Sequence, residues 1–116
     1  MAFKMRMGKL SMDNTPIYQV DLDGDIMGEA HNNGSILVDK NLSPEVREDA
    51  IRHEKVHLKQ MGLEKDESGK YRRDLDYDDE FVYWKGKKYP RSKMDEGNKN
   101  LPWEKEAWKA NKLNYS

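Results

Sequence analysis

The chain has 116 residues, of which 35% are hydrophobic and 37% are charged, so we expect one domain, residues 1–116, with a small core. Its 21 basic and 22 acidic side chains leave a formal net charge of -1, which offers no overall field for nucleic acid or an anionic membrane. Cysteine is absent, which excludes disulfide bonds and thiolate metal sites. The strong zinc ligands that remain are histidine, aspartate and glutamate.

Targeting and membrane-spanning segments are not apparent in the sequence. The first ten residues alternate basic and apolar side chains, and no later stretch is apolar for long enough to cross a bilayer. The expected location is therefore cytoplasmic. A monomer that binds neither membrane nor nucleic acid is the expected state.

The first part of the chain has the pattern of short strands. Apolar and polar residues alternate over residues 3–7 and 18–22, as in half-buried strands. Turn sequences then flank residues 25–29, and the apolar run 35–38 is expected to end as a strand at Asp39. We therefore expect an α+β fold with a small antiparallel or mixed sheet.

A helix is predicted from Ser43 to Gly62. Ser43 can cap it, Pro44 suits its first position, and Gly62 suits a left-handed C-terminal cap. Within these bounds, positions 46, 50, 53 and 57 follow a spacing of four, three and four residues, which places them on the inward face of the helix.

The second half of the chain is more polar. Residues 64–80 are acid-rich and are interpreted as a surface connection, whereas residues 81–89 have the pattern of a hairpin that turns at Gly86. Pro102 is expected to begin a closing helix, in which Trp103, Ala107 and Ala110 share one face.

The sequence His53-Glu54-Lys55-Val56-His57 lies in the predicted first helix. Residues four apart project from the same face of a helix, so both imidazoles can bind one ion while Glu54 points towards its water. A catalytic zinc site commonly has three protein ligands and an open fourth position. The candidates for the third ligand are His31, an aspartate of residues 64–80, Glu104 and Glu106, and their positions along the chain do not decide among them.

Three segments together resemble the gluzincin-type zinc metallopeptidases, in particular the small minigluzincins and the phage-type and ImmA/IrrE-like relatives. These segments are the strand-like residues 34–39, the HExxH run 53–57, and residues 101–107, which contain Glu104 followed three residues later by Ala107. The resemblance implies a zincin-like fold, a Zn²⁺ cofactor held by His53, His57 and Glu104, and Glu54 as general base in the hydrolysis of peptide or protein substrates. It also implies that the strand at residues 35–38 borders the substrate cleft.

A physical argument supports Glu104 over Glu106. A small side chain at Ala107 would let the closing helix approach the motif helix closely, and Glu106 would then point elsewhere. Many HExxH enzymes have an uncharged residue directly after the motif glutamate, and this chain departs from that pattern with Lys55, while Arg52 directly precedes His53.

Two other functions fit the same residues. One is a regulatory or interaction module that binds zinc with little turnover, and the other is an interaction domain without metal. In small members of the family that the chain resembles, the C-terminal segment can lie in the cleft, and the resemblance implies the same for residues 112–116. An oxyanion donor is left undecided by the sequence among five candidates, namely Tyr71, Tyr77, Tyr83, Tyr89 and His31.

Overall fold

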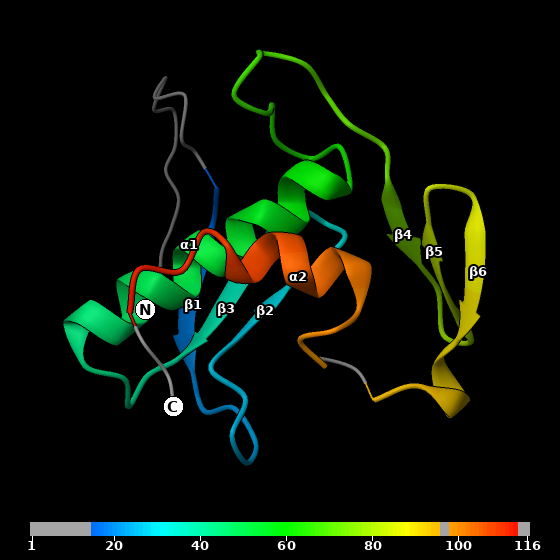
Figure 1. Cartoon of the computed structure of the whole chain (residues 1–116). Helices are drawn as coiled ribbons and strands as arrows, with labels where there is room; N and C mark the ends of the chain where they lie inside the picture. Colours follow the sequence, from blue (N-terminus) through cyan, green and yellow to red (C-terminus); the bar gives the residue numbers. More distant parts are fainter. Residues whose placement is uncertain (1–14, 96–97, 114–116) are drawn as a thin grey trace.

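A computed structural model describes residues 15–95 and 98–113 of the chain, and the strand predicted at residues 3–7 lies outside them. Within the described part, the chain forms two α-helices, two small sheets and one short 3₁₀ helix, so the predicted α+β class is confirmed (Figure 1). The elements in chain order are β1 (Ile17–Val20), β2 (Gly28–Ala30), β3 (Ile36–Asp39), α1 (Pro44–Gln60), β4 (Leu75–Tyr77), β5 (Phe81–Trp84), β6 (Lys87–Pro90), η1 (Arg91–Lys93) and α2 (Pro102–Trp108).

The first sheet is mixed and has the strand order β1-β3-β2. β1 runs parallel to β3, with Ile17 opposite Ile36, whereas β2 runs antiparallel to β3, with Gly28 opposite Val38. The side chains of Ile36 and Val38 are fully buried, which anchors β3 in the core. Since β3 is paired on both sides, β1 and β2 are the edge strands of this sheet as formed by residues 15–95 and 98–113.

α1 begins and ends where its sequence predicts. The Ser43 hydroxyl accepts a hydrogen bond from the backbone N–H of Val46, and Pro44 occupies the first helical turn. Gly62, just beyond the helix, has a φ of 78°. A Cβ at this position would lie 2.3 Å from the carbonyl oxygen of Arg72, so a glycine is required both by the backbone conformation and by the neighbouring loop.

The second sheet has the order β4-β5-β6 and is antiparallel. The predicted hairpin is confirmed as β5 and β6, and its turn is made by Lys85 and Gly86, both with positive φ. The prediction that residues 64–80 form only a surface connection is wrong, because they include β4. Leu75 is buried and pairs with Trp84 across the sheet, but the aspartates on either side of β4 conceal this short strand in the sequence.

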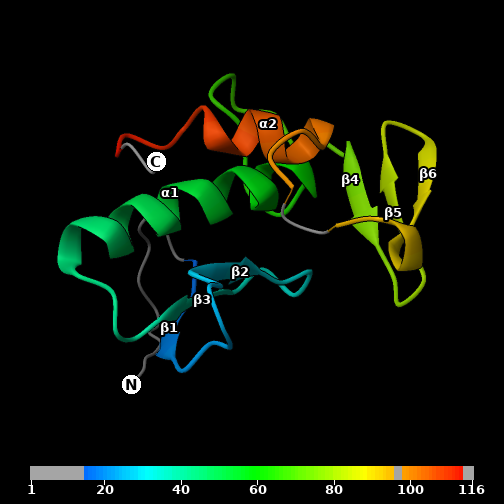
Figure 2. The ribbon, with the colours of Figure 1, turned by 60° about the horizontal axis from the view of Figure 1, so that its bottom comes forward.

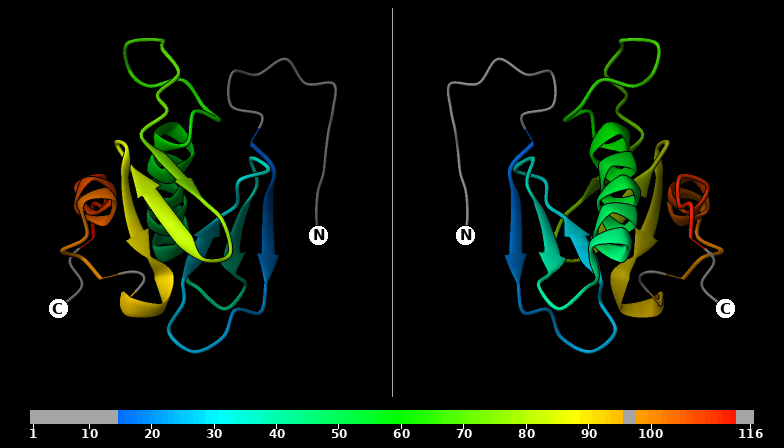
Figure 3. Two further views of the ribbon diagram at one scale, coloured as in Figure 1. Left: turned by 90° about the vertical axis from the view of Figure 1, so that its right-hand side faces the viewer. Right: turned by 90° about the vertical axis from the view of Figure 1, so that its left-hand side faces the viewer.

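The two helices and the first sheet form successive layers. Figure 2 shows α1 between the first sheet and α2, and the side views of Figure 3 show the first sheet and α2 on opposite sides of α1. The second sheet lies beside the C-terminal half of α1 (Figure 1). A single cluster of buried residues joins these parts, comprising Ile36, Val38, Ala50, Leu58, Met61, Leu75, Val82, Trp84 and Trp103.

α2 buries Trp103 and Ala107, as its pattern predicts, but it ends at Trp108. Ala110 therefore lies beyond the helix and is half-buried, so its predicted place on the same helical face is wrong. Neither described helix combines the length and the apolar composition that a bilayer span requires.

Candidate metal centre

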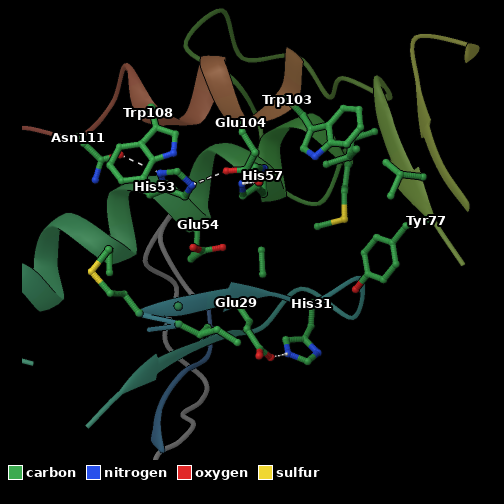
Figure 4. A pocket seen from close by; sticks show the side chains of 18 of the residues that line it. Glu29, His31, His53, Glu54, His57, Tyr77, Trp103, Glu104, Trp108 and Asn111 are labelled. Atoms are coloured by element: carbon green, nitrogen blue, oxygen red, sulfur yellow. Dashed lines mark hydrogen bonds and ion pairs between the residues drawn. The ribbon is translucent and has the colours of Figure 1, made fainter. Parts of the chain in front are cut away.

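Side chains from both helices meet at one point between α1 and α2. Nε2 of His53 lies 3.0 Å from Oε1 of Glu104, and Nε2 of His57 lies 3.2 Å from Oε2 of the same carboxylate. One ligand atom from each residue falls within 4.8 Å of the other two, so the three groups are close enough to hold one metal ion. Figure 4 shows both imidazoles directed from α1 towards Glu104 on α2.

The close approach of α2 to α1 depends on small and aromatic side chains beside the three candidate ligands. Ala107, one turn after Glu104, is fully buried. The ring of Trp108 packs edge-on against His53 at 5.0 Å between centroids, and His53 packs in the same manner against His57 at 5.1 Å. These contacts hold the imidazoles in place and limit their access to solvent.

The other sequence-based candidates for a third ligand lie elsewhere. Glu106 points away from the histidines and accepts hydrogen bonds from Arg72 and Gln60. His31 lies across the cavity on the β2 side, where its ring is 3.0 Å from the carboxylate of Glu29 (Figure 4). No aspartate of residues 64–80 belongs to the group of three.

The nitrogen of each imidazole that faces away from Glu104 also has a partner. Nδ1 of His53 lies 2.8 Å from the side-chain oxygen of Asn111, and Nδ1 of His57 lies 2.8 Å from that of Gln60. Sequence reasoning missed both amides. Gln60 left a signal, since a polar residue one turn after His57 shares its inward face, whereas Asn111 lies beyond α2 and left none.

The three groups have shifted pKa values. Burial acts to lower the pKa of His53 and His57, but hydrogen bonds to Glu104 and the charge of Glu54 outweigh it, and both pKa values are raised above 6.5. Burial acts to raise the pKa of Glu104, but the two histidines reverse this and lower it to about 2. The negative charge of Glu104 therefore favours the binding of a proton at each imidazole, or of a cation between the three groups.

Glu54 is buried but lies outside the group of three. Its side chain occupies the space between the histidines and β2, where a Cβ on Gly28 would come within 3.0 Å of its Cγ (Figure 4). Burial raises the pKa of Glu54, and the nearby charges of His57 and His53 oppose that shift. The carboxylate is thus held near the candidate metal ligands in a position suited to proton transfer.

A cavity of about 910 Å³ opens in front of these residues. β2 borders this cavity, whereas the strand at residues 35–38 is the central strand β3, so the expectation that residues 35–38 border the cleft is wrong. The chain turns at His31–Gly34 so that β2 and β3 pair antiparallel, and the residues of β2 line the cavity while those of β3 do not. Of the five oxyanion candidates, Tyr77 and His31 line the cavity.

The segment after α2 follows α1 without filling the cavity. Asn111 lines the cavity wall, while the backbone N–H groups of Lys112 and Leu113 donate hydrogen bonds to Asp49 on α1. The expectation of a blocking segment at residues 112–116 is not met by these two residues, and residues 114–116 lie outside the described part of the chain.

The chain matches no model of a known protein family, no curated protein and no solved structure. The site is therefore classified by its own geometry. Two buried histidines and a glutamate of an α+β chain lie close enough together to hold a metal ion. Two imidazoles and one carboxylate are a donor set that suits zinc and leaves a coordination position open.

Proposed function

We propose that this chain is a zinc-dependent metallopeptidase with a zincin-like arrangement of the gluzincin type. The observation that carries the proposal is the convergence of His53, His57 and Glu104, with a separate buried carboxylate, Glu54, beside them. Two histidines and a glutamate that hold one ion, together with a second glutamate that does not, constitute the parts needed for hydrolysis.

The electrostatics of the three groups support a cation between them. When both imidazoles are neutral and protonated on Nδ1, each directs a lone pair on Nε2 towards the negatively charged Glu104. Buried groups arranged in this way repel one another unless a positive ion joins them. A divalent ion bound by neutral histidines would supply the same positive charge as two protons on the imidazoles, which supports a cation at this position.

In the proposed reaction, each side chain has a distinct role. Zinc bound at this position would polarise a peptide carbonyl and bring the pKa of a water molecule towards neutrality. Glu54 takes the proton of that water and delivers it to the leaving amine. The raised pKa of Glu54 suits both steps. A carboxylate whose pKa is closer to neutrality takes a proton from water more readily, and it holds that proton until the leaving amine accepts it.

A peptide or protein substrate is proposed on the basis of β2. Within the part of the chain that the structure describes, β2 pairs with β3 alone, and its three residues line the cavity. An extended peptide can add to such an edge through main-chain hydrogen bonds, which would place a peptide carbonyl near Glu54 and the three candidate ligands. Tyr77 and His31 on the cavity wall are the proposed candidates for stabilising the oxyanion.

The proposal is tested with Glu54→Gln in a screen of peptide cleavage combined with zinc analysis. We expect the variant to keep its zinc and to lose cleavage, because Glu54 acts on the proton and not on the metal. Glu48→Gln is the matched control, since it alters an exposed glutamate of the same helix. A wild-type chain that binds zinc but cleaves nothing in a broad peptide library would instead favour a zinc-binding regulatory module.

A further inference from the structure

Each histidine begins a series of hydrogen-bonded groups on its side that faces away from Glu104. The two series contain the same kinds of chemical group in the same order. Behind His53, the Asn111 amide donates from Nδ2 to Asp49, 2.8 Å away, and Arg52 donates to Asp49 at 2.9 Å. The Asp49 carboxylate is fully buried and also accepts the backbone N–H groups of Lys112 and Leu113. Imidazole, amide, carboxylate and guanidinium thus follow one another.

The second series begins at His57. Here the Gln60 amide donates from Nε2 to Glu106 at 2.8 Å and to the carbonyl oxygen of Trp103 at 3.1 Å. Arg72 donates to both oxygens of Glu106, at 2.9 and 3.0 Å. Gln60 is fully buried, so its amide has no water with which to exchange these partners. The order of chemical groups is the same as behind His53, although the two series share no residue.

These partners determine the orientation of both amides. An ionised carboxylate and a carbonyl oxygen accept hydrogen bonds and cannot donate them, so the NH₂ groups of Asn111 and Gln60 must face Asp49 and Glu106. The amide oxygens must then face the imidazoles. An amide oxygen only accepts, and therefore Nδ1 of each histidine must carry a proton and donate it.

We propose that Asn111 and Gln60 are positioning residues that fix both metal-binding histidines in the tautomer with the proton on Nδ1. Nε2 of each imidazole is then free to bind zinc beside Glu104. This inference rests on the proposed zinc site and deepens it. In each series, the carboxylate and the arginine fix the orientation of the amide. The amide then fixes the tautomer and orientation of the imidazole, which would bind the metal.

One consequence concerns the segment that follows α2. Asn111 is held in place by Asp49, which the backbone of Lys112 and Leu113 also contacts. This segment is thus part of the support of the metal centre. Loss of this segment should weaken zinc binding because His53 loses its support. His57 should keep its support, since its hydrogen bonds run through Gln60 and Glu106.

The first experiment measures the protonation of the imidazole nitrogens in the unaltered chain by long-range ¹H–¹⁵N NMR of ¹⁵N-labelled histidine. The metal-free chain is measured at a pH where each ring holds a single proton, and we expect that proton on Nδ1 of His53 and His57. The zinc-loaded chain should show the same. A bare Nδ1 on either ring would overturn the inference. This result does not depend on whether the chain binds zinc or on how any variant folds, so it separates the inference from the proposed function.

The second experiment measures zinc affinity by competition with a chromophoric chelator. Asn111→Ala and Gln60→Ala should each weaken binding by about 10- to 100-fold, the usual effect of removing a group that orients a metal ligand. Lys109→Ala and Lys59→Ala are matched controls, since Lys109 is exposed and Lys59 forms an ion pair with Glu67. Alanine variants that bind zinc as tightly as these controls would overturn the positioning role while leaving the zinc site intact.

A reciprocal exchange distinguishes positioning from general stability. Asn111→Asp places two carboxylates against each other and should weaken zinc binding. In the double variant with Asp49→Asn, the amide at position 49 donates to the carboxylate at position 111. The side chain at position 111 still offers an oxygen to His53. The double variant should therefore regain most of the lost affinity. Failure of the double variant to improve on Asn111→Asp, with both chains folded by circular dichroism, would contradict the proposal.

Discussion

Gly28 on β2 lies directly against the side chain of Glu54 on α1. A Cβ built on Gly28 would be 3.0 Å from Cγ of Glu54 and 3.2 Å from its Oε2. The edge strand and the proposed general base are therefore in van der Waals contact, and the absence of a side chain at position 28 makes this contact possible. The same strand lines the cavity in which a substrate would lie.

This contact predicts the effect of Gly28→Ala. The added methyl group must displace the Glu54 carboxylate by a few tenths of an ångström, whereas the candidate zinc ligands do not touch it. A small misplacement of a catalytic group has a large effect on rate, and we expect kcat to fall by about tenfold or more with zinc content unchanged. Peptide-cleavage kinetics and zinc analysis of the same sample provide the measurement. An unchanged kcat would contradict the role given to Glu54.

The two glutamates of α2 are predicted to differ in their effect on zinc. Glu104→Ala removes one of three ligands, so zinc affinity should fall by more than the loss of about 10- to 100-fold expected for an orienting group. Glu106→Ala removes a partner of Gln60 and should weaken binding less. Chelator competition on both variants makes the comparison. A larger loss for Glu106→Ala would show that the third ligand has been assigned wrongly.

The pKa values predict how pH affects the stability of the metal-free chain. Glu104 has its pKa lowered from 4.5 to about 2, so it stabilises the folded chain above pH 4.5 and loses this effect as pH falls towards 2. His53 and His57 have raised pKa values, so they stabilise the chain below pH 6.5 and lose this effect as pH rises through their folded values.

The combined contribution of these three groups should be greatest between about pH 4.5 and 6.5. It is measured as the difference in Tm between the wild type and Glu104→Gln, both with chelator, from pH 3 to 9. A difference that grows steadily above pH 7 would contradict the assignment, because neutral imidazoles cannot donate two hydrogen bonds at Nδ1 and Nε2 at once.

Gly62→Ala is predicted to destabilise the chain. Its φ of 78° is unfavourable for alanine, and the new Cβ would lie 2.3 Å from the carbonyl oxygen of Arg72. The expected loss is more than about 1 kcal/mol in the free energy of unfolding. Denaturant unfolding with chelator present measures it, and Gly69→Ala is a suitable control, since it has a similar φ but no atom within 4 Å of the new Cβ.

The features that the sequence predicts well are those with local signals. Ser43, Pro44 and Gly62 mark the ends of α1, and the spacing of His53 and His57 places both imidazoles on one face. Ala107 indicated where two helices approach each other, and the structure brings Glu104 to the histidines beside it. The ends of α1 and the spacing of the histidines need only helix geometry, whereas the prediction of Glu104 rests on the family resemblance and on the size of Ala107.

The features that the sequence does not reveal depend on contacts between distant segments. β4 is three residues long and is defined by its pairing with β5, so its acidic neighbours dominate the local pattern. The choice of β2 as the strand beside the cavity depends on the order of strands in the sheet. Asn111 reaches His53 because the chain after α2 returns along α1, which no local pattern encodes.

The proposal that His53, His57 and Glu104 hold zinc is tested by the zinc content of the chain. The chain is purified without an affinity tag, reconstituted with zinc and dialysed, and its metal is measured by elemental analysis beside His57→Ala. We expect about one zinc per wild-type chain and little in the variant. No zinc in either chain, with both folded, would show that the two histidines and the glutamate do not form a zinc site.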